Sequence, residues 1–464
     1  MSTLLPNELL LEIFSRMSRV DLCSTSLASH AFCALARPLI FTTLYFRPYA
    51  FDDNVGVLCA PSGAQEEELA AKLALFSSTS ITPNVRFVWV NRLTSYPGFA
   101  RTKHRILDAP FVDNADTHAL LKPLFAAVAS FRNLRWFHAE RIPFTPGAID
   151  ALSQLLGLHK LDISACTLLL PLDNISLLHV VEVVIRGGGD CGPWLACMSP
   201  AKLTSVSLSF VPHITARALA MLPVFSRVTQ LKLPLAHAEL PTLLPPLAAA
   251  FPAVESIEID GFAFQATAVT YRSQPSQLFP QLIALESECE GAFAFLPRSR
   301  ITDLTLRNAE ANELCLALAA LPPGCAEAIT RLQVALDWLP GPDVPDVLAH
   351  FPALEWLALE LVFYGAADRE TTESILAFVT ALPSLLPASL LSLRLRAEEL
   401  SYGVDDDELA AEEGSPLAIP DTRGLQAALV VRCPALHAVD IYVPRLQLEW
   451  YASIGFETER MGGA

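Results

Sequence analysis

A short apolar pattern that recurs along most of the chain limits its possible folds more than any other feature. The pattern, called the tag below, reads apolar-x-x-apolar-x-apolar, and successive tags begin about 25 residues apart, a period typical of solenoid repeats. Its last three residues alternate in the manner of a short strand with one buried face. Clear tags begin at Leu158, Val180, Leu203, Val228, Val254, Ile301, Ile329, Leu354, Leu390 and Leu436, and weaker tags begin at Val85, Leu134 and Leu282.

The segments between the tags predict helices. In residues 240–251 the apolar residues recur three and four positions apart, which is the spacing of one helix face. Several segments end in an apolar residue and a proline directly before the next tag, as at Phe251-Pro252 and Phe351-Pro352. Proline disfavours helical geometry in its predecessor, so it ends a helix before a strand. Each unit is therefore expected to hold one strand and one helix, and neighbouring units must stack because neither element can bury its apolar face alone.

This strand and helix unit resembles the leucine-rich repeat. The asparagine or cysteine that the family usually carries three places after the last tag residue is present as Cys166, but most tags lack it. The resemblance implies an α/β solenoid of parallel strands and helices over residues 85–443, with irregular loops. An acidic loop is expected at 398–424 and a tail at 444–464. A doubly wound α/β domain is the alternative, but it would not produce a fixed period.

The first forty residues predict three short helices. Pro6 suits the start of a helix, where its missing N–H has no partner to lose. Apolar residues then recur at helical spacing as far as Met17, a break follows at Ser18-Arg19, and two more short helices are expected before Leu39. Three helices of this size bury too little surface to be stable alone. They therefore need to pack on the rest of the chain or on a partner.

This N-terminal segment resembles the F-box, the module that docks substrate receptors onto the adaptor subunit of cullin–RING ubiquitin ligases. The resemblance depends on Leu5-Pro6-x-Glu8-Leu9, Ile13-Phe14, Asp21-Leu22 and Ser26-Leu27 followed by Phe32. The segment departs from the family at Ala28, where valine is usual, and at Phe32, where tryptophan is common. The resemblance implies an F-box at 1–46, followed by an insertion or linker at 47–84. It implies adaptor contacts by Leu5, Pro6, Glu8, Leu9, Ile13, Phe14, Asp21, Leu22 and Leu27.

Together, the two resemblances imply the substrate-recognition subunit of an SCF-type ubiquitin ligase. The F-box would bind the adaptor, and the solenoid would bind a protein client of unknown identity. A non-catalytic leucine-rich-repeat scaffold whose N-terminal helices only cap the solenoid is the alternative. A cap would bury Leu5, Ile13 and Phe14 against residues near Val85, whereas a docking module would leave an apolar patch exposed.

The strand residues that alternate with the tag residues predict the client surface, because successive strand side chains point to opposite faces. We expect an acidic patch at Glu258, Asp260, Glu286 and Glu288, since neighbouring strands lie about 4.8 Å apart. A smaller basic patch is expected nearer the C-terminus, with aromatic anchors of the kind that dominate interfaces. An ordinary solvated strand surface is the alternative. The complete predicted set is Glu258, Asp260, Glu286, Glu288, Arg307, Arg331, Trp356, Arg394, Arg396 and Tyr442.

Composition argues against several partners. Hydrophobic residues make up 52% of the chain and the mean hydropathy is +0.39, but no apolar run approaches the roughly 18 residues that a membrane-spanning helix requires. The net charge of −17 argues against nucleic acid as the main partner, because phosphate contacts need clustered cations. The ten cysteines include no Cys-x-x-Cys pair, and no export signal begins the chain. These features predict a cytoplasmic or nuclear protein.

The sequence offers no pattern typical of an enzyme. It contains no Gly-x-Ser-x-Gly elbow, no His-Glu-x-x-His and no Gly-Lys-Ser or Gly-Lys-Thr phosphate loop. The glycine-rich segment 187–192 lacks the spacing of a dinucleotide-binding loop. The ten histidines are scattered without metal-ligand spacing. We therefore expect neither catalytic activity, nor a metal site, nor a cofactor.

Overall fold

The computed structural model forms two compact units, Met1–Val228 with Ala249–Phe251 (unit 1) and Thr229–Ala248 with Pro252–Ala464 (unit 2). The described residues are 5–52, 57–90, 119–169, 176–187, 190–209, 215–234, 240–259, 278–288, 292, 295–296, 300–309, 314, 318, 324–336, 344–364, 369–400, 421–444 and 446–451.

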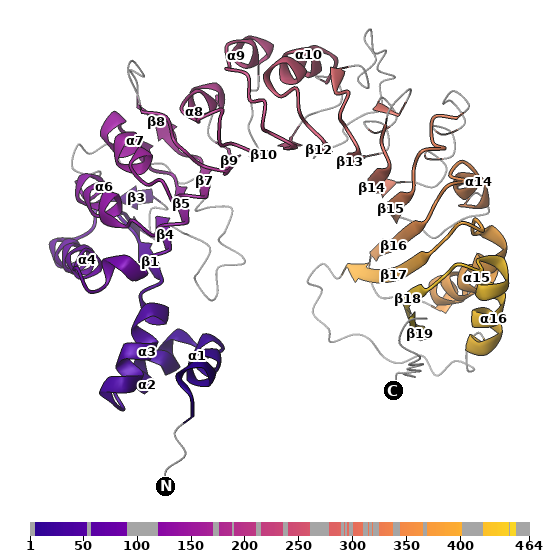
Figure 1. Cartoon of the computed structure of the whole chain (residues 1–464), viewed down its shortest axis with the longest axis horizontal. Helices are drawn as coiled ribbons and strands as arrows, with labels where there is room; N and C mark the ends of the chain where they lie inside the picture. Colours follow the sequence, from indigo (N-terminus) through magenta and orange to yellow (C-terminus); the bar gives the residue numbers. More distant parts are fainter. Residues whose placement is uncertain are drawn as a thin grey trace. The chain divides into compact units, whose positions relative to one another are not determined.

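Unit 1 begins with a module of three short helices, α1 (Asn7–Ser15), α2 (Arg19–Ser26) and α3 (His30–Ile40), drawn in indigo in Figure 1. Serine caps begin two of them, as the sequence favours. The Ser18 hydroxyl accepts a hydrogen bond from the Asp21 amide at 3.2 Å, and the Ser29 hydroxyl accepts one from the Phe32 amide at 3.1 Å. These caps fix the two breaks between the helices.

The module has its own small apolar core. Its buried residues are Phe14, Leu22, Ala36 and Ile40, with Phe32 packed against them. The rings of Phe14 and Phe32 meet edge to face with their centroids 5.6 Å apart. Because these contacts are internal to α1, α2 and α3, the buried side of each helix faces the other two.

The rest of unit 1 is a ladder of parallel strands with helices between them (Figure 1). In ladder order the strands are β1 (Thr43–Phe46), β4 (Phe87–Val90), β5 (Trp136–Glu140), β7 (Lys160–Ser164), β9 (Glu182–Arg186) and β10 (Ser205–Ser209). The intervening helical elements are α4 (Gly63–Phe76), η1 (Thr82–Asn84), α6 (Leu121–Ser130), α7 (Pro146–Ser153), α8 (Gly192–Ala196) and α9 (Ala216–Ala220). Two small pairs complete it: β2 (Ala50–Asp52) with β3 (Val57–Cys59), and β6 (Pro143–Phe144) with β8 (Thr167–Leu168).

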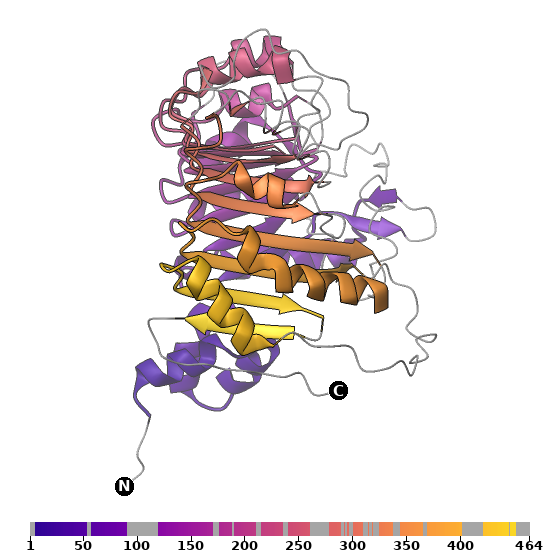
Figure 2. The same ribbon diagram turned by 90° about the vertical axis from the view of Figure 1, so that its right-hand side faces the viewer.

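Unit 2 continues the same strand and helix alternation. Its strands are β11 (Gln230–Leu233), β12 (Ser256–Ile259), β13 (Ala284–Glu288), β14 (Asp303–Ala309), β15 (Arg331–Leu336), β16 (Trp356–Tyr364), β17 (Ser392–Leu400), β18 (Ala438–Val443) and β19 (Leu446–Tyr451). Neighbours pair in parallel except β19, which pairs antiparallel with β18. The helices are α10 (Leu240–Ala250), α14 (Val344–Ala349), α15 (Arg369–Leu385) and α16 (Thr422–Arg432). Figure 2 shows α15 and α16 on one side of their strands.

The strands form at the tags, and the apolar tag residues are buried in both units. In β7, Leu161 and Ile163 are buried, and in β16 the matching Leu357 and Leu359 are buried as well. The ring of Phe125 on α6 packs against Phe137 on β5, with centroids 5.9 Å apart, so the tag side of the strands faces the helices. The prediction of an α/β leucine-rich-repeat-like fold preceded by three helices is confirmed.

Strands also occur outside the range 85–443 that was predicted for the solenoid. The first strand, β1, lies within the residues 1–46 that were assigned to the F-box, and it pairs with β4. The insertion at 47–84 contains α4, which starts with a capping box between Ser62 and Gln65. At the C-terminal end, β19 lies within residues 444–464, which were expected to be a tail. This segment forms a strand because Leu446 and Leu448 alternate with polar residues and bury one face. The expected acidic loop lies largely outside the described residues, at 401–420.

Candidate protein-binding surfaces

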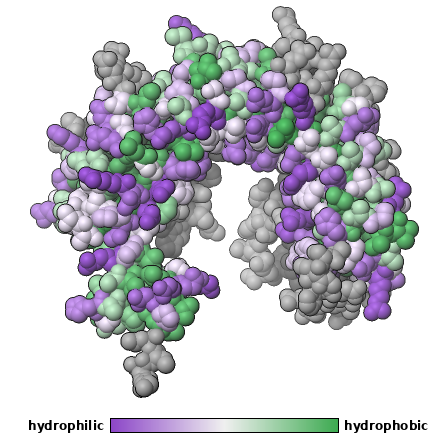
Figure 3. All heavy atoms as spheres, in the orientation of Figure 1, coloured by the Kyte–Doolittle hydropathy of each residue, from purple (hydrophilic) through white to green (hydrophobic). Residues whose placement is uncertain are grey.

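The N-terminal module exposes apolar side chains on its outside. Leu5 and Leu9 are each 51% exposed and Ile13 is 47% exposed. Leu9 and Ile13 are four residues apart on α1, so they lie on one face of that helix. Val20 and Leu27, at the two ends of α2, are also largely exposed. Figure 3 shows the resulting apolar surface on the module, in green at the lower left. This apolar surface is the kind of patch that a partner covers.

The exposed fractions of Leu5 and Ile13 distinguish a docking module from a cap of the solenoid. A cap would have buried Leu5 and Ile13 against the start of the solenoid, but both are about half exposed. Phe14 is buried, yet its neighbours are Leu22, Ala36 and Ile40 of the module itself. The module is therefore packed internally and keeps an apolar exterior.

Two residues expected at the adaptor contact are corrected by the structure. Phe14 and Leu22 are buried in the core of the module, so their side chains have no surface to offer a partner in this conformation. The helical spacing of α1 turns Phe14 by about 100° from Ile13, which places it in the core of the module and away from the face that Leu9 and Ile13 share. Of the polar residues expected there, Glu8 is exposed in the first turn of α1, and the Asp21 carboxylate accepts a hydrogen bond from the Ser18 hydroxyl at 2.6 Å.

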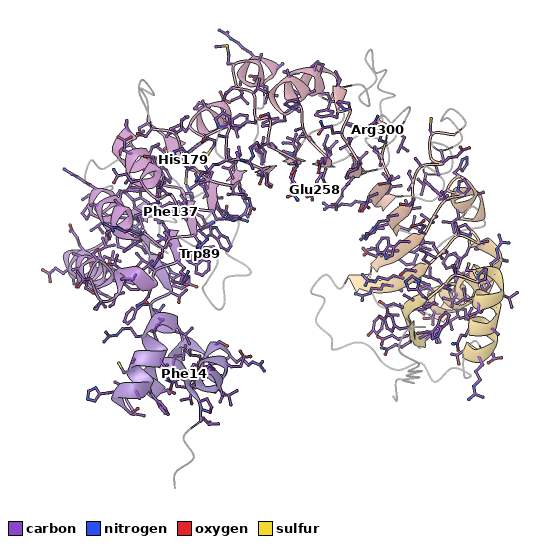
Figure 4. All side chains as sticks on the ribbon, in the orientation of Figure 1. Phe14, Trp89, Phe137, His179, Glu258 and Arg300 are labelled. Carbon is purple, nitrogen blue, oxygen red and sulfur yellow. The ribbon has the colours of Figure 1, made fainter. Side chains whose placement is uncertain are left out.

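A second surface is the strand face of unit 2, defined as the side chains that alternate with the tag residues on β11–β18. The register places Lys232, Glu258 and Glu286 beside one another on successive strands. Lys232 Nζ lies 2.6 Å from Glu258 Oε1, and Arg307 Nη2 lies at the same distance from that oxygen. Arg307 also pairs with Glu286 (Figure 4 labels Glu258).

This pairing differs from the acidic patch that the sequence predicted. The prediction followed the carboxylates along successive strands; it included Arg307 in the client surface but did not pair it, or Lys232, with these glutamates. Burial raises the pKa of Glu286, and the nearby Glu258 carboxylate adds to the rise, while Arg307 opposes it. The Glu258 and Glu286 charges are therefore neutralised within unit 2. Asp260 lies outside the described residues, and Glu288 is in register with Arg307.

From β15 to β18, the strand face of unit 2 carries arginines and aromatic residues. The Arg331 guanidinium lies over the Trp356 ring, 5.0 Å from its centroid. Arg394 and Arg396 on β17 both reach Asp440 on β18, and Tyr442 is exposed beside Arg396. The structure thus brings together five residues that the sequence predicted for the client surface: Arg331, Trp356, Arg394, Arg396 and Tyr442.

The strand face of unit 1 carries a buried ionic cluster that the sequence interpretation missed. His138 Nε2 lies 3.0 Å from Glu140 Oε1, and His138 Nδ1 lies 3.3 Å from Asp162 Oδ2. The Arg186 guanidinium lies 3.3 Å from the same Asp162 oxygen. Burial alone lowers the pKa of His138, but the contacts with Asp162 and Glu140 outweigh it, so the pKa is raised.

Aromatic rings flank this cluster. The Trp89 ring lies 4.8 Å from that of Trp136 and 4.6 Å from that of His138, measured between centroids. Lys160 Nζ lies 5.0 Å from the centroid of the Trp136 ring. In Figure 4, Trp89 is on the opposite side of the strands from Phe137, which faces the helices. The sequence did contain a signal for the three rings. Trp89 occupies an alternate position of the weaker tag at 85, and Trp136 and His138 occupy the alternate positions of the weaker tag at 134.

Within the described ranges, no group of three or more histidine, cysteine, aspartate or glutamate residues is arranged to hold a metal ion. Among the helices of the described part of the chain, none has both the length and the apolar content needed to cross a membrane.

Comparison with known proteins supports the N-terminal assignment. The family model described as F-box-like matches residues 3–47, which contain α1, α2, α3 and β1. No curated protein matches the chain. Among solved structures, the chain is similar to the crystal structure of a TLR13–ssRNA13 complex, with 11% identity and a TM-score of 0.29. The match covers 78% of this chain and 53% of that chain, so this chain spans about half of its length. A TM-score of 0.29 is too low to transfer any property of that protein.

Proposed function

We propose that this chain is the substrate-recognition subunit of an SCF-type cullin–RING ubiquitin ligase, acting in the cytoplasm or nucleus. In this proposal the F-box-like module binds the adaptor subunit, and the strand faces of the solenoid receive a protein client. The chain itself catalyses no step. Its role is to raise the effective concentration of client lysines near the ubiquitin-loaded enzyme held by the same assembly.

The observation that carries the proposal is the exposed apolar face of α1 within the segment that matches the F-box-like family. Complete burial of a leucine side chain contributes about 1.5–3 kcal/mol. Leu5, Leu9 and Ile13 are about half exposed, so covering each contributes roughly 1 kcal/mol. Three such residues provide the apolar centre that a stable interface needs, and Val20 on α2 and Leu27 directly after it are further exposed apolar side chains of the module.

The alternative function is a repeat scaffold whose helices only cap the solenoid. A helix that only caps a solenoid is expected to present a polar outer face to solvent, whereas the outer face of α1 is apolar. The exposure of Leu5 and Ile13 therefore favours docking over capping.

The test is a binding measurement between the full chain and the adaptor subunit of an SCF-type ligase. The double variant Leu9→Asp with Ile13→Asp is expected to bind at least about 30-fold more weakly, because it places two charges in the apolar centre of the interface. Leu156→Asp is the matched control, since Leu156 is an exposed leucine of unit 1 outside the module. An adaptor that fails to bind the unaltered chain, or that binds the double variant equally well, would contradict the proposal.

A further inference from the structure

At the arginine-rich end of the strand face of unit 2, two guanidinium groups lie further toward solvent than the carboxylate that pairs with them. Arg394 Nε lies 3.3 Å from Asp440 Oδ2, and Arg396 Nη2 lies 3.2 Å from the same oxygen. Two guanidinium groups therefore share a single carboxylate oxygen. A guanidinium has five N–H donors, so most donors of these two side chains are not used by Asp440.

The neighbouring carboxylate does not complete the pairing. Glu360 is the register partner of Arg396 on β16 and keeps its charge there, but its Oε1 accepts a hydrogen bond from the neutral Gln333 Nε2 at 2.9 Å and not from Arg396. The Nε atom of Arg396 is buried and has no hydrogen-bond acceptor within the described part of the chain. A buried donor without an acceptor is costly in a folded protein, so Asp440 does not satisfy the whole guanidinium of Arg396.

The exposed fractions of the charged side chains also show that the arginines are accessible to a ligand. The side chain of Asp440 is 18% exposed, whereas those of Arg394 and Arg396 are 47% and 42% exposed. The anion thus lies low against the sheet and the cations project outward. Arg331, over the Trp356 ring, is 56% exposed and lies 3.5 Å from its one paired carboxylate, that of Asp303.

The spacing of these arginines matches the side chains of an extended peptide. Arg394 and Arg396 are two residues apart on β17, which separates them by about 6.6 Å. Alternate side chains of a bound extended segment have that same separation. Arg331 is on β15, two strands from β17, at about 9.6 Å across the ladder. Exposed Tyr442 and the Trp356 ring flank the cations and supply aromatic contact area.

We propose that this arginine face, formed by Arg331, Arg394 and Arg396 with Trp356 and Tyr442, binds an acidic peptide segment of the client. The recognised groups are two anions in an acidic-x-acidic pattern, either carboxylates or phosphates, since arginine binds both in the same forked geometry. The inference rests on the proposed function in that it names the chemistry of the client. The net charge of −17 repels anions at long range, so the selectivity must come from these local contacts.

The test uses the full chain and four pools of dodecapeptides with randomised flanks and a fixed centre. The centres are Glu-x-Glu, phosphoserine-x-phosphoserine, Ser-x-Ser and Lys-x-Lys. At least one acidic pool is expected to be retained about tenfold or more over the serine and lysine pools. The better retained acidic pool identifies carboxylate or phosphate as the source of the anion.

Variants assign the retention to the arginine face. Arg394→Gln with Arg396→Gln is expected to abolish the preference for acidic pools, whereas Arg423→Gln is expected to keep it, because Arg423 is an exposed arginine on α16. Thermal unfolding and adaptor binding of the same preparations check that each variant is folded. Preferred retention of the serine or lysine pool, or an unchanged acidic preference in the double variant, would overturn the inference. Failure of adaptor binding with intact peptide retention would instead overturn the proposed function alone.

Discussion

The strand faces of the two units both carry an aspartate at a mid-strand position, but the two aspartates lie at different depths. On unit 1, Asp162 is buried and forms an ionic cluster with the buried His138 and Glu140 and with the partly exposed Arg186. On unit 2, the side chain of Asp440 is 18% exposed, and both of its partners are partly exposed arginines. A buried cluster stabilises a fold only while all its members are present, whereas exposed charges contribute little to stability and remain available to a partner.

Removal of the two aspartates in turn is expected to give the largest difference in stability between the two strand faces. Asp162→Ala leaves His138 buried with Glu140 as its remaining partner in the cluster, so we expect a loss of about 3 kcal/mol in the free energy of unfolding. Asp440→Ala is the matched variant, with an expected loss of about 1 kcal/mol or less. Denaturant unfolding of both variants measures the difference, and equal losses would show that the two faces do not differ in this way.

The two variants also differ in the expected effect on binding. Because Asp440 occupies the donors of Arg394 and Arg396, its removal frees them and should strengthen retention of acidic peptides. Asp162→Ala should not change that retention while the chain is folded.

A second pair of variants contrasts leucines of the repeat with leucines of the module. Leu161→Ala removes a fully buried tag residue and is expected to cost about 2–5 kcal/mol of stability. Leu9→Ala removes a half-exposed residue of α1 and is expected to change stability by about 0.5 kcal/mol or less. Adaptor binding should show the reverse order, with Leu9→Ala weakened and Leu161→Ala unchanged below its unfolding temperature. A large loss of stability in Leu9→Ala would mean that α1 is a structural cap.

The smallest expected effect is the pH dependence of the unit 1 cluster. The pKa of His138 is raised in the folded state, because its contacts with Asp162 and Glu140 outweigh the opposing effect of burial. Its protonation therefore stabilises the fold fully below the unfolded pKa of about 6.5, and this contribution is lost as the pH rises through the folded pKa. Unfolding measured from pH 6 upward should show this decline, and His138→Gln should flatten it. An unchanged slope in that variant would assign the decline to other groups.

The fold was largely predictable because its determinants are local and periodic. Each tag combines strand alternation with a fixed period, and residues such as Leu161 and Leu357 are buried as that pattern requires. The ends were harder to predict. β1 and β19 lie beyond the tag pattern, and β19 is recognisable only by the alternation of Leu446 and Leu448.

The binding surfaces were less predictable because they depend on contacts across several strands. Glu258 and Glu286 led to the prediction of an acidic patch. Their charges are neutralised by Lys232 and Arg307, which lie on flanking strands. The inward orientation of Phe14 depends on how α1 packs against α2 and α3, which periodicity alone did not resolve. The His138 cluster was missed because the tag that contains His138 is weak and the members of the cluster come from three different strands.

Hydrogen–deuterium exchange of the full chain, with and without the adaptor subunit, tests the central claim most directly. We expect the adaptor to slow amide exchange within residues 7–26, which contain α1 and α2, and to leave exchange in β7, β16 and β17 unchanged. Slowed exchange on those strands with none in α1, or no complex at all, would contradict the account.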